Sequence, residues 1–510
     1  MNPDAEKVSY SLFSCIGTGF AAIALGAQLK RWYGIEDIQF FERHSSLGGT
    51  WFINKYPGCA CDVPSALYSI SFAPNPDWTK VMPSHSELWE YLDKVARDYD
   101  LIDVPGVETF RGEVVHTGKW RPIDLEGKKV IMFGNGCTAS QVVPAIVHKT
   151  KSLTQVVRTK HWIMPSLDAD VPPWVRLVLK WVPAVAWLQR LMIFCVAENS
   201  FRGFRMTDGG KKFRASQRKV SEDYMRAAAP AKYHDMLIPD FEVNCKRRIF
   251  DPGYLQSIHA DNFDLTDEKV VEITPDGVRT ANGFIEADVL IFATGYHTNQ
   301  FAAGIDVRGR GGETLESRWE ALGGEGAYNT TAMSGFPNFF FLLGPNSVTG
   351  HTSTVMALEN CINYALRVIK PVLKGRSATA MIKSDAEQRY VDDIQDALQK
   401  TVWNTGCGAW YTKTSRDGTK RWNAMGYPYS QPHFWYRCLF PVWSDWQYSG
   451  RAAYASQIHT QGSGVWITAV LVAIVTLAVL GFLGRDWLRG IVPDLSAATR
   501  GSAAFVPNYL

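Results

Sequence analysis

The chain has 510 residues, of which 46% are hydrophobic and 20% charged, and its formal net charge is +3. This length exceeds a single typical hydrophobic core, so two or three domains are expected, and the near-balanced charge gives no support to a nucleic-acid partner. The nine cysteines form no Cys-x-x-Cys pair and no Cys/His set at metal-ligand spacing. This distribution predicts no metal site and reduced, unpaired thiols.

The first predicted module consists of a strand, a glycine turn, a helix and a second strand. A strand within residues 10–16 leads into Gly17-Thr-Gly-Phe-Ala-Ala22, and the strand of residues 38–41 ends at an acid. Glycines let the backbone approach a pyrophosphate at the helix N-terminus, and the acid is placed to bind a ribose diol. The alternative is an ordinary strand-to-helix turn. The predicted dinucleotide-binding residues are Gly17, Gly19, Ala22 and Glu42.

The segment that follows is short. A helix is expected within residues 86–98, and a linking segment, Phe110 to Trp120, then leads to the next module. Residues 93–109 are too few for a further hairpin and a closing strand, given strands of about five residues. This predicts an incomplete sheet in the first module. His116, in the linking segment, is expected to be a hinge or interdomain contact.

A second module repeats the plan. The strand of residues 128–133 leads into Gly134-Asn-Gly-Cys-Thr-Ala139 and a helix over 140–147, in which Pro144 should cause a kink. The next strand, 154–157, ends in a cation instead of an acid. Arginine binds a 2′-phosphate that an acid would repel, so this site favours NADP over NAD, unless the cation is merely solvated. The predicted binding residues are Gly134, Gly136, Ala139, Arg158 and Thr159.

The second module also contains a predicted helical insertion, residues 168–240. Its apolar part, Trp174 to Ala197, is either a subdomain packed on the core or a lip that faces an apolar pocket or a membrane. A hairpin is expected around Asp276-Gly277, followed by a buried strand over residues 287–295 that ends in Ala-Thr-Gly. The first module has no counterpart of this closing strand.

Near the C-terminus, Val465 to Leu483 carries no charged residue. As a helix this run would rise roughly 29 Å, close to the thickness of a bilayer core. Trp466 and Trp487 flank it in the manner of interfacial anchors. The run therefore predicts a transmembrane helix, with a buried core helix as the alternative.

Three motifs resemble those of flavin-dependent class B monooxygenases, in particular the Baeyer–Villiger type. The linking segment keeps Phe110, Gly112, His116 and Trp120. A second signature is Gly48-Gly-Thr-Trp51 with Tyr56-Pro-Gly58 and Asp62, and Gly344 to His351 is similar to a late flavin-contacting loop. The resemblance covers about residues 10–450, and its style is that of fungal members in secondary-metabolite pathways.

The resemblance implies an α/β fold with two Rossmann-like dinucleotide-binding domains, one for FAD and one for NADP. The implied organisation is a first part of the FAD domain at 1–125, an NADP domain at 126–296 with the insertion 168–240, a second part of the FAD domain at 297–455, a transmembrane helix at 465–483 and a tail at 484–510.

The resemblance also implies a site. Asp62 and Arg247 match the catalytic pair, although Arg248 leaves that assignment open by one position. Lys246 would join Arg158 and Thr159 at the 2′-phosphate. NADPH would reduce FAD, O2 would give a flavin peroxide, and one oxygen atom would enter an apolar ketone while the guanidinium holds the developing oxyanion. The implied FAD contacts are Gly49, Thr50, Trp51, Asp62 and Asn346.

Several alternatives remain open from the sequence. Oxygenation at nitrogen or sulfur, or epoxidation, would use the same cofactors. A disulfide reductase would need a redox cysteine pair, and Cys59 and Cys61 have the wrong spacing for one. The short 93–109 segment also allows a truncated, inactive nucleotide-binding form. The expected partners are a small organic substrate, O2 and a membrane that holds the C-terminal helix, with the catalytic part facing the cytoplasm.

Overall fold

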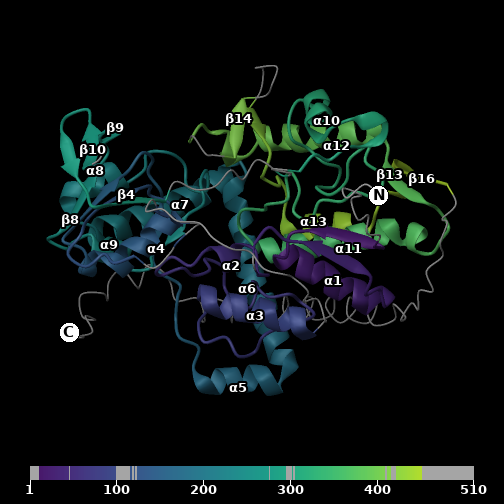
Figure 1. The fold of residues 1–510 in the computed structure, drawn as a ribbon, viewed down its shortest axis with the longest axis horizontal. Coiled ribbons are helices and arrows are strands. Elements are labelled where there is room, and N and C mark those ends of the chain that lie inside the picture. Colours follow the sequence, from purple (N-terminus) through teal and green to yellow (C-terminus); the bar gives the residue numbers. More distant parts are fainter. Residues whose placement is uncertain are drawn as a thin grey trace, which may run out of the picture. The chain divides into compact units, whose positions relative to one another are not determined.

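A computed structural model gives the fold (Figure 1) and describes residues 11–98 except 45, 115–117, 120, 123–293 except 275, 301, 305–407, 411–414 and 421–450. Residues 1–31 and 35–458 belong to one unit. The predicted transmembrane helix 465–483, the tail 484–510, Phe110 and Gly112 lie outside the described residues.

The first module forms as predicted. Strand β1 (Phe13–Ile16) leads through the glycine turn into α1 (Phe20–Tyr33), and β2 (Ile38–Phe41) pairs in parallel with β1 from Phe13↔Ile38 to Ile16↔Phe41. Within the described part of the chain these two strands form a sheet of their own. Ile16 remains 60% exposed and Phe41 48% exposed. Parallel sheets normally bury such residues, so the exposure agrees with an incomplete sheet, which stays a prediction because residues 99–114 are not described.

The second module contains a five-stranded parallel sheet in the order β3-β12-β4-β5-β8. Helix α4 (Cys137–Ile146) follows the second glycine turn, buries Val142 and Val143, and contains Pro144. Part of the linking segment belongs to this sheet, since Val115–His116 is strand β3 beside β12. His116 lies in this edge strand, and its predicted role as a hinge or interdomain contact stays a prediction. The other strands are β4 (Lys129–Phe133), β5 (Ser152–Val156), β8 (Phe263–Thr266) and β12 (Val289–Phe292).

The predicted hairpin and insertion are both present. The hairpin joins β9 (Val270–Thr274) to β10 (Gly277–Thr280), and β11 (Phe284–Glu286) extends it. The insertion is helical, as expected. Its main helices are α5 (Pro173–Trp181), α6 (Pro183–Asn199), α7 (Asp208–Ala228) and α8 (His234–Leu237). Close to it lie β6 (Ile163–Met164), β7 (Ile249–Phe250) and α9 (Tyr254–Ser257).

No single helix among the described residues is both long and apolar enough to cross a bilayer. One sharply bent pair, Pro173–Trp181 with Ala184–Phe204, meets the length and composition criteria when its two helices are taken together.

The remaining elements pack on the first module. Helix α11 (Thr354–Leu373) lies beside α1 in Figure 1, and Gln28 Nε2 donates to Asn363 Oδ1 at 3.2 Å. Helix α11 begins where Ser353 Oγ accepts from Val355 N. The other elements are α2 (Thr50–Ile53), α3 (His85–Asp98), α10 (Leu315–Leu322), β13 (Thr379–Ile382), α12 (Ser384–Gln399), β14 (Thr412–Thr414), β15 (Arg421–Asn423), α13 (Gln431–Leu439) and β16 (Trp446–Ser449).

Candidate active site

The first glycine turn is packed against the second signature motif. Gly48 N donates to Thr18 O at 2.9 Å, and a Cβ added at Gly49 would lie 2.9 Å from Gly19 Cα. Gly17 has a φ of +93°, and a Cβ there would meet no atom within 4 Å. The turn thus has an open side at the N-terminus of α1, and Ala22 is buried behind it. This arrangement fits a pyrophosphate, which such turns bind through backbone amides.

Glu42 closes the turn from the end of β2. Its Oε2 accepts from Thr18 N at 2.8 Å and from Thr18 Oγ1 at 2.7 Å, while its Oε1 accepts from the amides of Arg43 and His44. Burial raises the pKa of Glu42, but these hydrogen bonds outweigh burial and hold the pKa below its usual value. A ribose diol that binds Glu42 as predicted would therefore share an ionised carboxylate with the backbone and side-chain donors of the turn.

The second glycine turn has equivalent geometry. Gly134 has a φ of +121°, and a Cβ there would lie 2.3 Å from Ala293 O, so the turn lies directly against the end of β12. A Cβ at Gly136 would meet nothing within 4 Å, and α4 begins at the next residue. Ala139 is fully buried. This turn, too, fits a pyrophosphate at a helix N-terminus.

The second signature motif joins the two modules. Tyr56 Oη donates to Gln141 Oε1 at 3.0 Å, and Gln141 Nε2 donates to Ala60 O at 3.2 Å. Gly58 has a φ of +77°, and a Cβ there would lie 2.6 Å from Gln141 O. The signature motif of the first module therefore packs closely on α4 of the second module. This contact brings Asp62 close to Cys137, the first residue of α4.

Asp62 and Arg247 meet at this junction. Arg247 Nε donates to Asp62 Oδ2 at 2.7 Å, and Arg247 Nη2 donates to Asp62 Oδ1 at 2.8 Å. The Asp62 carboxylate raises the pKa of Arg247 further above its ordinary value. The arginine side chain still keeps 44% of its surface exposed. Arg247 is thus an accessible cation, and two hydrogen bonds to Asp62 set the orientation of its guanidinium group.

The neighbouring cation has a different partner. Arg248 Nη1 donates to Gln217 Oε1 on α7 at 2.9 Å. Burial, followed by repulsion from Arg247, lowers the pKa of Arg248. Of the two arginines, Arg247 is therefore the one that pairs with Asp62.

The predicted 2′-phosphate contacts lie at the end of β5. Arg158 and Thr159 are exposed there, and Lys246 is buried. Burial, followed by repulsion from Arg158, lowers the pKa of Lys246. Burial and Lys246 also lower the pKa of the adjacent His161 to about 4. Two cations and a neutral imidazole are favourable surroundings for a phosphate dianion.

The other predicted FAD contacts have different surroundings. Trp51 is buried and donates through Nε1 to Tyr68 Oη at 3.3 Å, whereas Thr50 is exposed at the start of α2. Asn346 is buried, and its Nδ2 donates to the carbonyls of Asn423 and Gly426. The backbone N of Asn346 also donates, to Ala424 O at 2.8 Å, so a flavin contact from Asn346 would use its backbone carbonyl or its side-chain amide oxygen.

The cysteines correct one expectation. Cys245, next to Lys246, forms a disulfide with Cys407, although the two are 162 residues apart in sequence. The prediction of unpaired thiols is wrong for these two, because only the tertiary fold brings them together. Cys59 and Cys61 are free and buried, and burial raises the pKa of both thiols, to about 11 for Cys59. Two buried, protonated thiols do not make the redox pair of a disulfide reductase.

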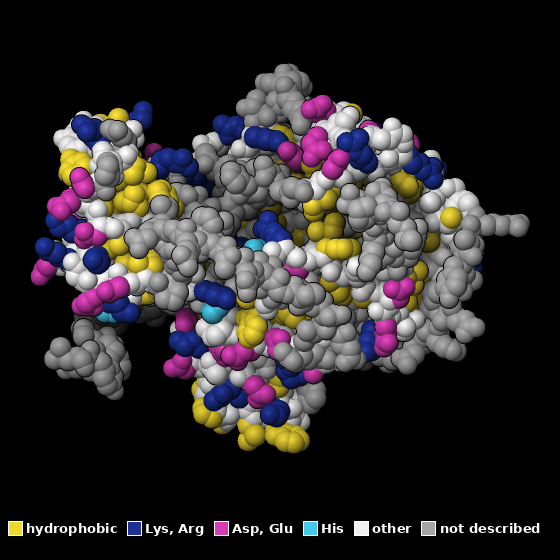
Figure 2. Space-filling view, viewed as in Figure 1, with side chains coloured by type: hydrophobic (Ala, Val, Ile, Leu, Met, Phe, Trp, Pro, Cys, Tyr) yellow, Lys and Arg dark blue, Asp and Glu magenta, His cyan; other side chains and the backbone are white. Residues whose placement is uncertain are grey.

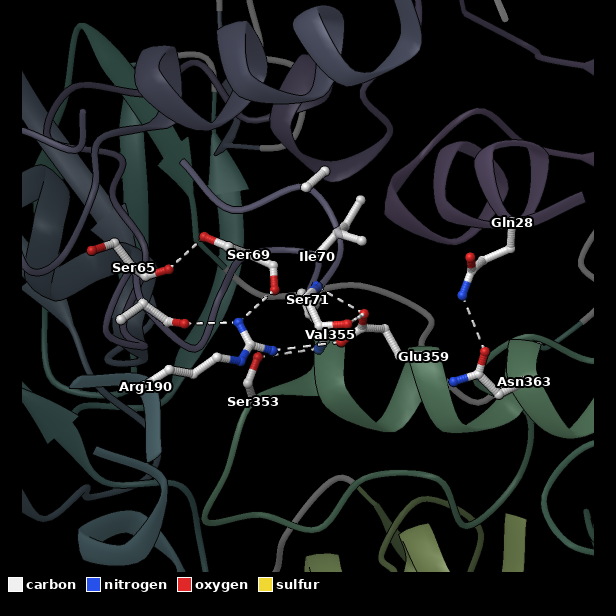
Figure 3. Close-up of polar contacts among 12 residues, drawn as sticks. Gln28, Ser65, Ser69, Ile70, Ser71, Arg190, Ser353, Val355, Glu359 and Asn363 are labelled. Carbon is white, nitrogen blue, oxygen red and sulfur yellow. Dashed lines mark hydrogen bonds and ion pairs between the residues drawn. The ribbon is translucent and has the colours of Figure 1, made fainter. Parts of the chain in front are cut away.

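Two polar clusters near the site had no signal in the sequence. In Figure 3, Arg190 of α6 points toward the loop of residues 65–71 and toward α11. Its Nη1 donates to Ala66 O at 2.8 Å and to Ser69 O at 2.9 Å, and its Nη2 lies 3.5 Å from Glu359 Oε2. Glu359 Oε1 accepts from Ser71 N and Oγ. This cluster connects the helical insertion to both parts of the first domain.

The second cluster lies at the C-terminal end of α6. His351 has a fully buried side chain, its Nε2 lies 2.9 Å from Glu198 Oε2, and its Nδ1 lies 2.7 Å from Thr349 O. The Glu198 carboxylate also accepts from Gln431 N at 3.3 Å. The insertion is thus tied to the late loop, Gly344 to His351, as well.

Comparison with known proteins supports this geometry. Residues 15–83 match the model of an NAD(P)-binding Rossmann-like domain. The fold matches a crystal structure of OTEMO in complex with FAD and NADP, with a TM-score of 0.73 and 20% identity over 86% of this chain and 100% of that one. It also matches cyclohexanone monooxygenase from Rhodococcus sp. Phi1 bound to NADP+, with a TM-score of 0.72 and 21% identity over 86% of this chain and 99% of that one. The fold of this chain is therefore similar to the fold of these two proteins.

Sequence relatives define the family. A Baeyer–Villiger monooxygenase of Streptomyces coelicolor is 31% identical over 80% of this chain and 88% of its own length. Another, from Pseudomonas aeruginosa, is 30% identical over 80% of this chain and 86% of its own length. An FAD-binding monooxygenase of Aspergillus terreus is 27% identical over 82% of this chain and 86% of its own length. The chain belongs to the Baeyer–Villiger monooxygenase family.

Proposed function

We propose that this protein uses FAD, NADPH and O2 to insert one oxygen atom beside the carbonyl of an apolar ketone. The observation that carries the proposal is the bidentate Asp62–Arg247 pair at the junction of the two glycine-turn modules. FAD, when bound, would supply the two-electron chemistry that accepts a hydride from NADPH and activates O2. The first glycine turn would hold FAD, and the second would hold NADPH with Arg158, Thr159 and Lys246.

The residues of the pair have distinct tasks. Asp62 uses both carboxylate oxygens to fix the guanidinium plane through Nε and Nη2. This leaves Nη1 of Arg247 to hold the negative charge that develops on an oxygen in the transition state. A guanidinium stays charged at every working pH, so its stabilisation of that oxygen needs no proton transfer.

Substitution of Arg247 tests the proposal. In Arg247→Ala, and in Arg247→Lys, which keeps the charge but loses the bidentate geometry, we expect ester formation to fall by roughly 100-fold or more. NADPH-dependent flavin reduction should continue, because the arginine acts on oxygen transfer. Assays with added FAD would follow ester by mass spectrometry and NADPH by absorbance.

The matched control is Arg226→Ala. Arg226 donates through Nε and Nη2 to Glu222 on the surface of α7. The substitution thus removes an arginine–carboxylate pair that is not the Asp62–Arg247 pair. This variant should keep wild-type ester formation. Unchanged ketone oxygenation in Arg247→Ala would contradict the proposed role of this arginine. A wild-type protein that oxygenates a sulfide but no ketone would favour heteroatom oxygenation instead.

We further propose a role in secondary metabolism, supported by the fungal style of the sequence motifs. The run Val465–Leu483 is proposed as a single-pass membrane helix on the strength of its sequence.

The catalytic part is proposed to face the cytoplasm, which its seven free cysteines support. The Cys245–Cys407 disulfide argues against this orientation, because disulfides are rare in the reducing cytoplasm. Protease protection of sealed microsomes tests the orientation, and a protected catalytic part would reject it.

A further inference from the structure

The helical insertion has an exposed apolar surface. On α5, Trp174 is 69% and Trp181 is 73% exposed, and α5 buries no residue. Figure 2 shows hydrophobic side chains gathered over this part of the molecule, at the bottom of the view, where Figure 1 places α5. We call the hairpin surface the set formed by Trp174, Leu177, Trp181, Val185, Leu188, Met192 and Val196. Val182 and Trp187 of the same segment are also exposed but do not belong to this set.

The spacing of these residues places them on one side of each helix. Positions 174, 177 and 181 share a face of α5, and positions 185, 188, 192 and 196 share a face of α6. Arg190 lies on the opposite face of α6. Helix α5 is strongly amphipathic and turns its apolar face outward, whereas an amphipathic helix in a water-soluble protein normally buries that face. Helix α6 is apolar on most of its sides, and the residues named above are the part of it that faces outward.

The inner face of α6 is firmly held. Arg190 donates to Ala66 O and Ser69 O and pairs with Glu359, as Figure 3 shows. At the end of α6, Glu198 contacts His351. Because these contacts fix the orientation of α6, the outward direction of Val185, Leu188, Met192 and Val196 is a property of the fold.

The charged side chains that α5 itself carries are all positive. Between Asp170 and Glu198 the sequence contains no acidic residue, but it contains Arg176 and Lys180 on α5. Lys180 approaches Asp77 at 3.5 Å, and both side chains are more than half exposed, so that contact is weak. Tryptophan at an apolar edge with nearby cations is the composition of helices that lie in the interface of an anionic bilayer.

We propose that the hairpin surface docks on the headgroup region of a lipid membrane, with anionic lipids favoured. Helix α5 has nine residues and rises about 14 Å, too little to cross a bilayer, so it would lie along the interface. This contact is independent of the run Val465–Leu483 and would place the insertion, and with it the catalytic junction, beside dissolved apolar substrates.

Cys195 provides a local probe. It is the exposed one among the seven free cysteines, and it lies on α6 between Met192 and Val196. The full chain would be labelled there with a polarity-sensitive fluorophore and mixed with vesicles of phosphatidylcholine, with or without phosphatidylserine. We expect a blue shift that is larger with phosphatidylserine and is reduced by salt. Cys195→Ser would report labelling elsewhere.

Two variants make the test specific. Trp174→Ser with Leu177→Ser and Trp181→Ser should reduce the vesicle-dependent shift about tenfold or more, because the apolar area available for insertion is removed. The matched control substitutes Trp435, Tyr436 and Trp443, which are 45%, 56% and 53% exposed, by serine. The control should retain the shift.

Three results would overturn the proposal. The label could stay in polar surroundings while the chain floats with vesicles, which would assign membrane binding to Val465–Leu483 alone. A shift without lipid that grows with protein concentration would identify a second copy as the occupant. A shift without lipid that is independent of concentration would mean that the chain's own C-terminal segment covers the surface.

Discussion

Lys246 is a buried cation close enough to a second cation, Arg158, to be repelled by it. It is buried, and burial followed by repulsion from Arg158 lowers its pKa. A bound 2′-phosphate would relieve both costs, because it supplies a charge-assisted hydrogen-bond acceptor. The strained cation thus favours a ligand that carries the phosphate.

This gives a pH-dependent prediction. As pH rises, Lys246 should lose its proton before an ordinary lysine does, so KM for NADPH should rise at a pH below that at which ordinary lysines titrate, while KM for NADH stays flat. Lys246→Arg keeps the charge and should remove the rise. Lys246→Gln should raise KM for NADPH roughly 10- to 100-fold at neutral pH, the loss of one charged hydrogen bond. Steady-state kinetics with both nucleotides measures this, and equal effects on NADH would refute it.

At the scale of elements, the contact between the second signature motif and α4 determines whether Asp62 reaches Arg247. Gly58 is the closest approach, since a Cβ there would lie 2.6 Å from Gln141 O. Tyr56 and Ala60 bond to the same glutamine. A displacement of this contact would move Asp62, which is four residues further along the chain.

We predict that Gly58→Ala destabilises the protein by at least about 2 kcal/mol, through both its positive φ and the clash. Gly127→Ala is the matched control. Gly127 has a φ of +65°, but a Cβ there would meet nothing within 4 Å, so it should cost only about 1 kcal/mol of backbone strain. Urea unfolding gives both values. If the two substitutions cost the same, the close packing on α4 contributes nothing.

The elements themselves could be predicted from local sequence, and their long-range partners could not. The glycine turns, the strand ends at Glu42 and Arg158 and the hairpin at Gly277 follow from short motifs whose geometry is set within a few residues. The contacts of Arg190 with Glu359, by contrast, depend on how distant helices pack. The resemblance suggested Asp62 and Arg247, and the structure adds their bidentate contact, while their catalytic roles stay a prediction.

At the scale of the whole molecule, the short segment of residues 93–109 determines how complete the FAD-binding module can be. The alignment with the Streptomyces coelicolor enzyme extends over 462 residues yet covers 80% of this 510-residue chain. That enzyme therefore carries residues with no counterpart here. The exposed Ile16 and Phe41 of the two-stranded sheet agree with such a difference.

We therefore predict that purified protein contains FAD below one equivalent and loses it on desalting. The first glycine turn is intact, so added FAD should bind and be bleached by NADPH under anaerobic conditions. The ratio of flavin to protein absorbance before and after desalting measures the occupancy. A stoichiometric, firmly retained FAD would show that the shortened module supports a complete site.

The bond between Cys245 and Cys407 turns the intervening residues into a closed covalent ring. The ring includes Lys246 and Arg247 at one end and α11 along its course. A protease that cuts one exposed turn inside the ring, such as that around Asp276, would leave both pieces on a single molecule, so the cut chain would separate into two bands only after reduction.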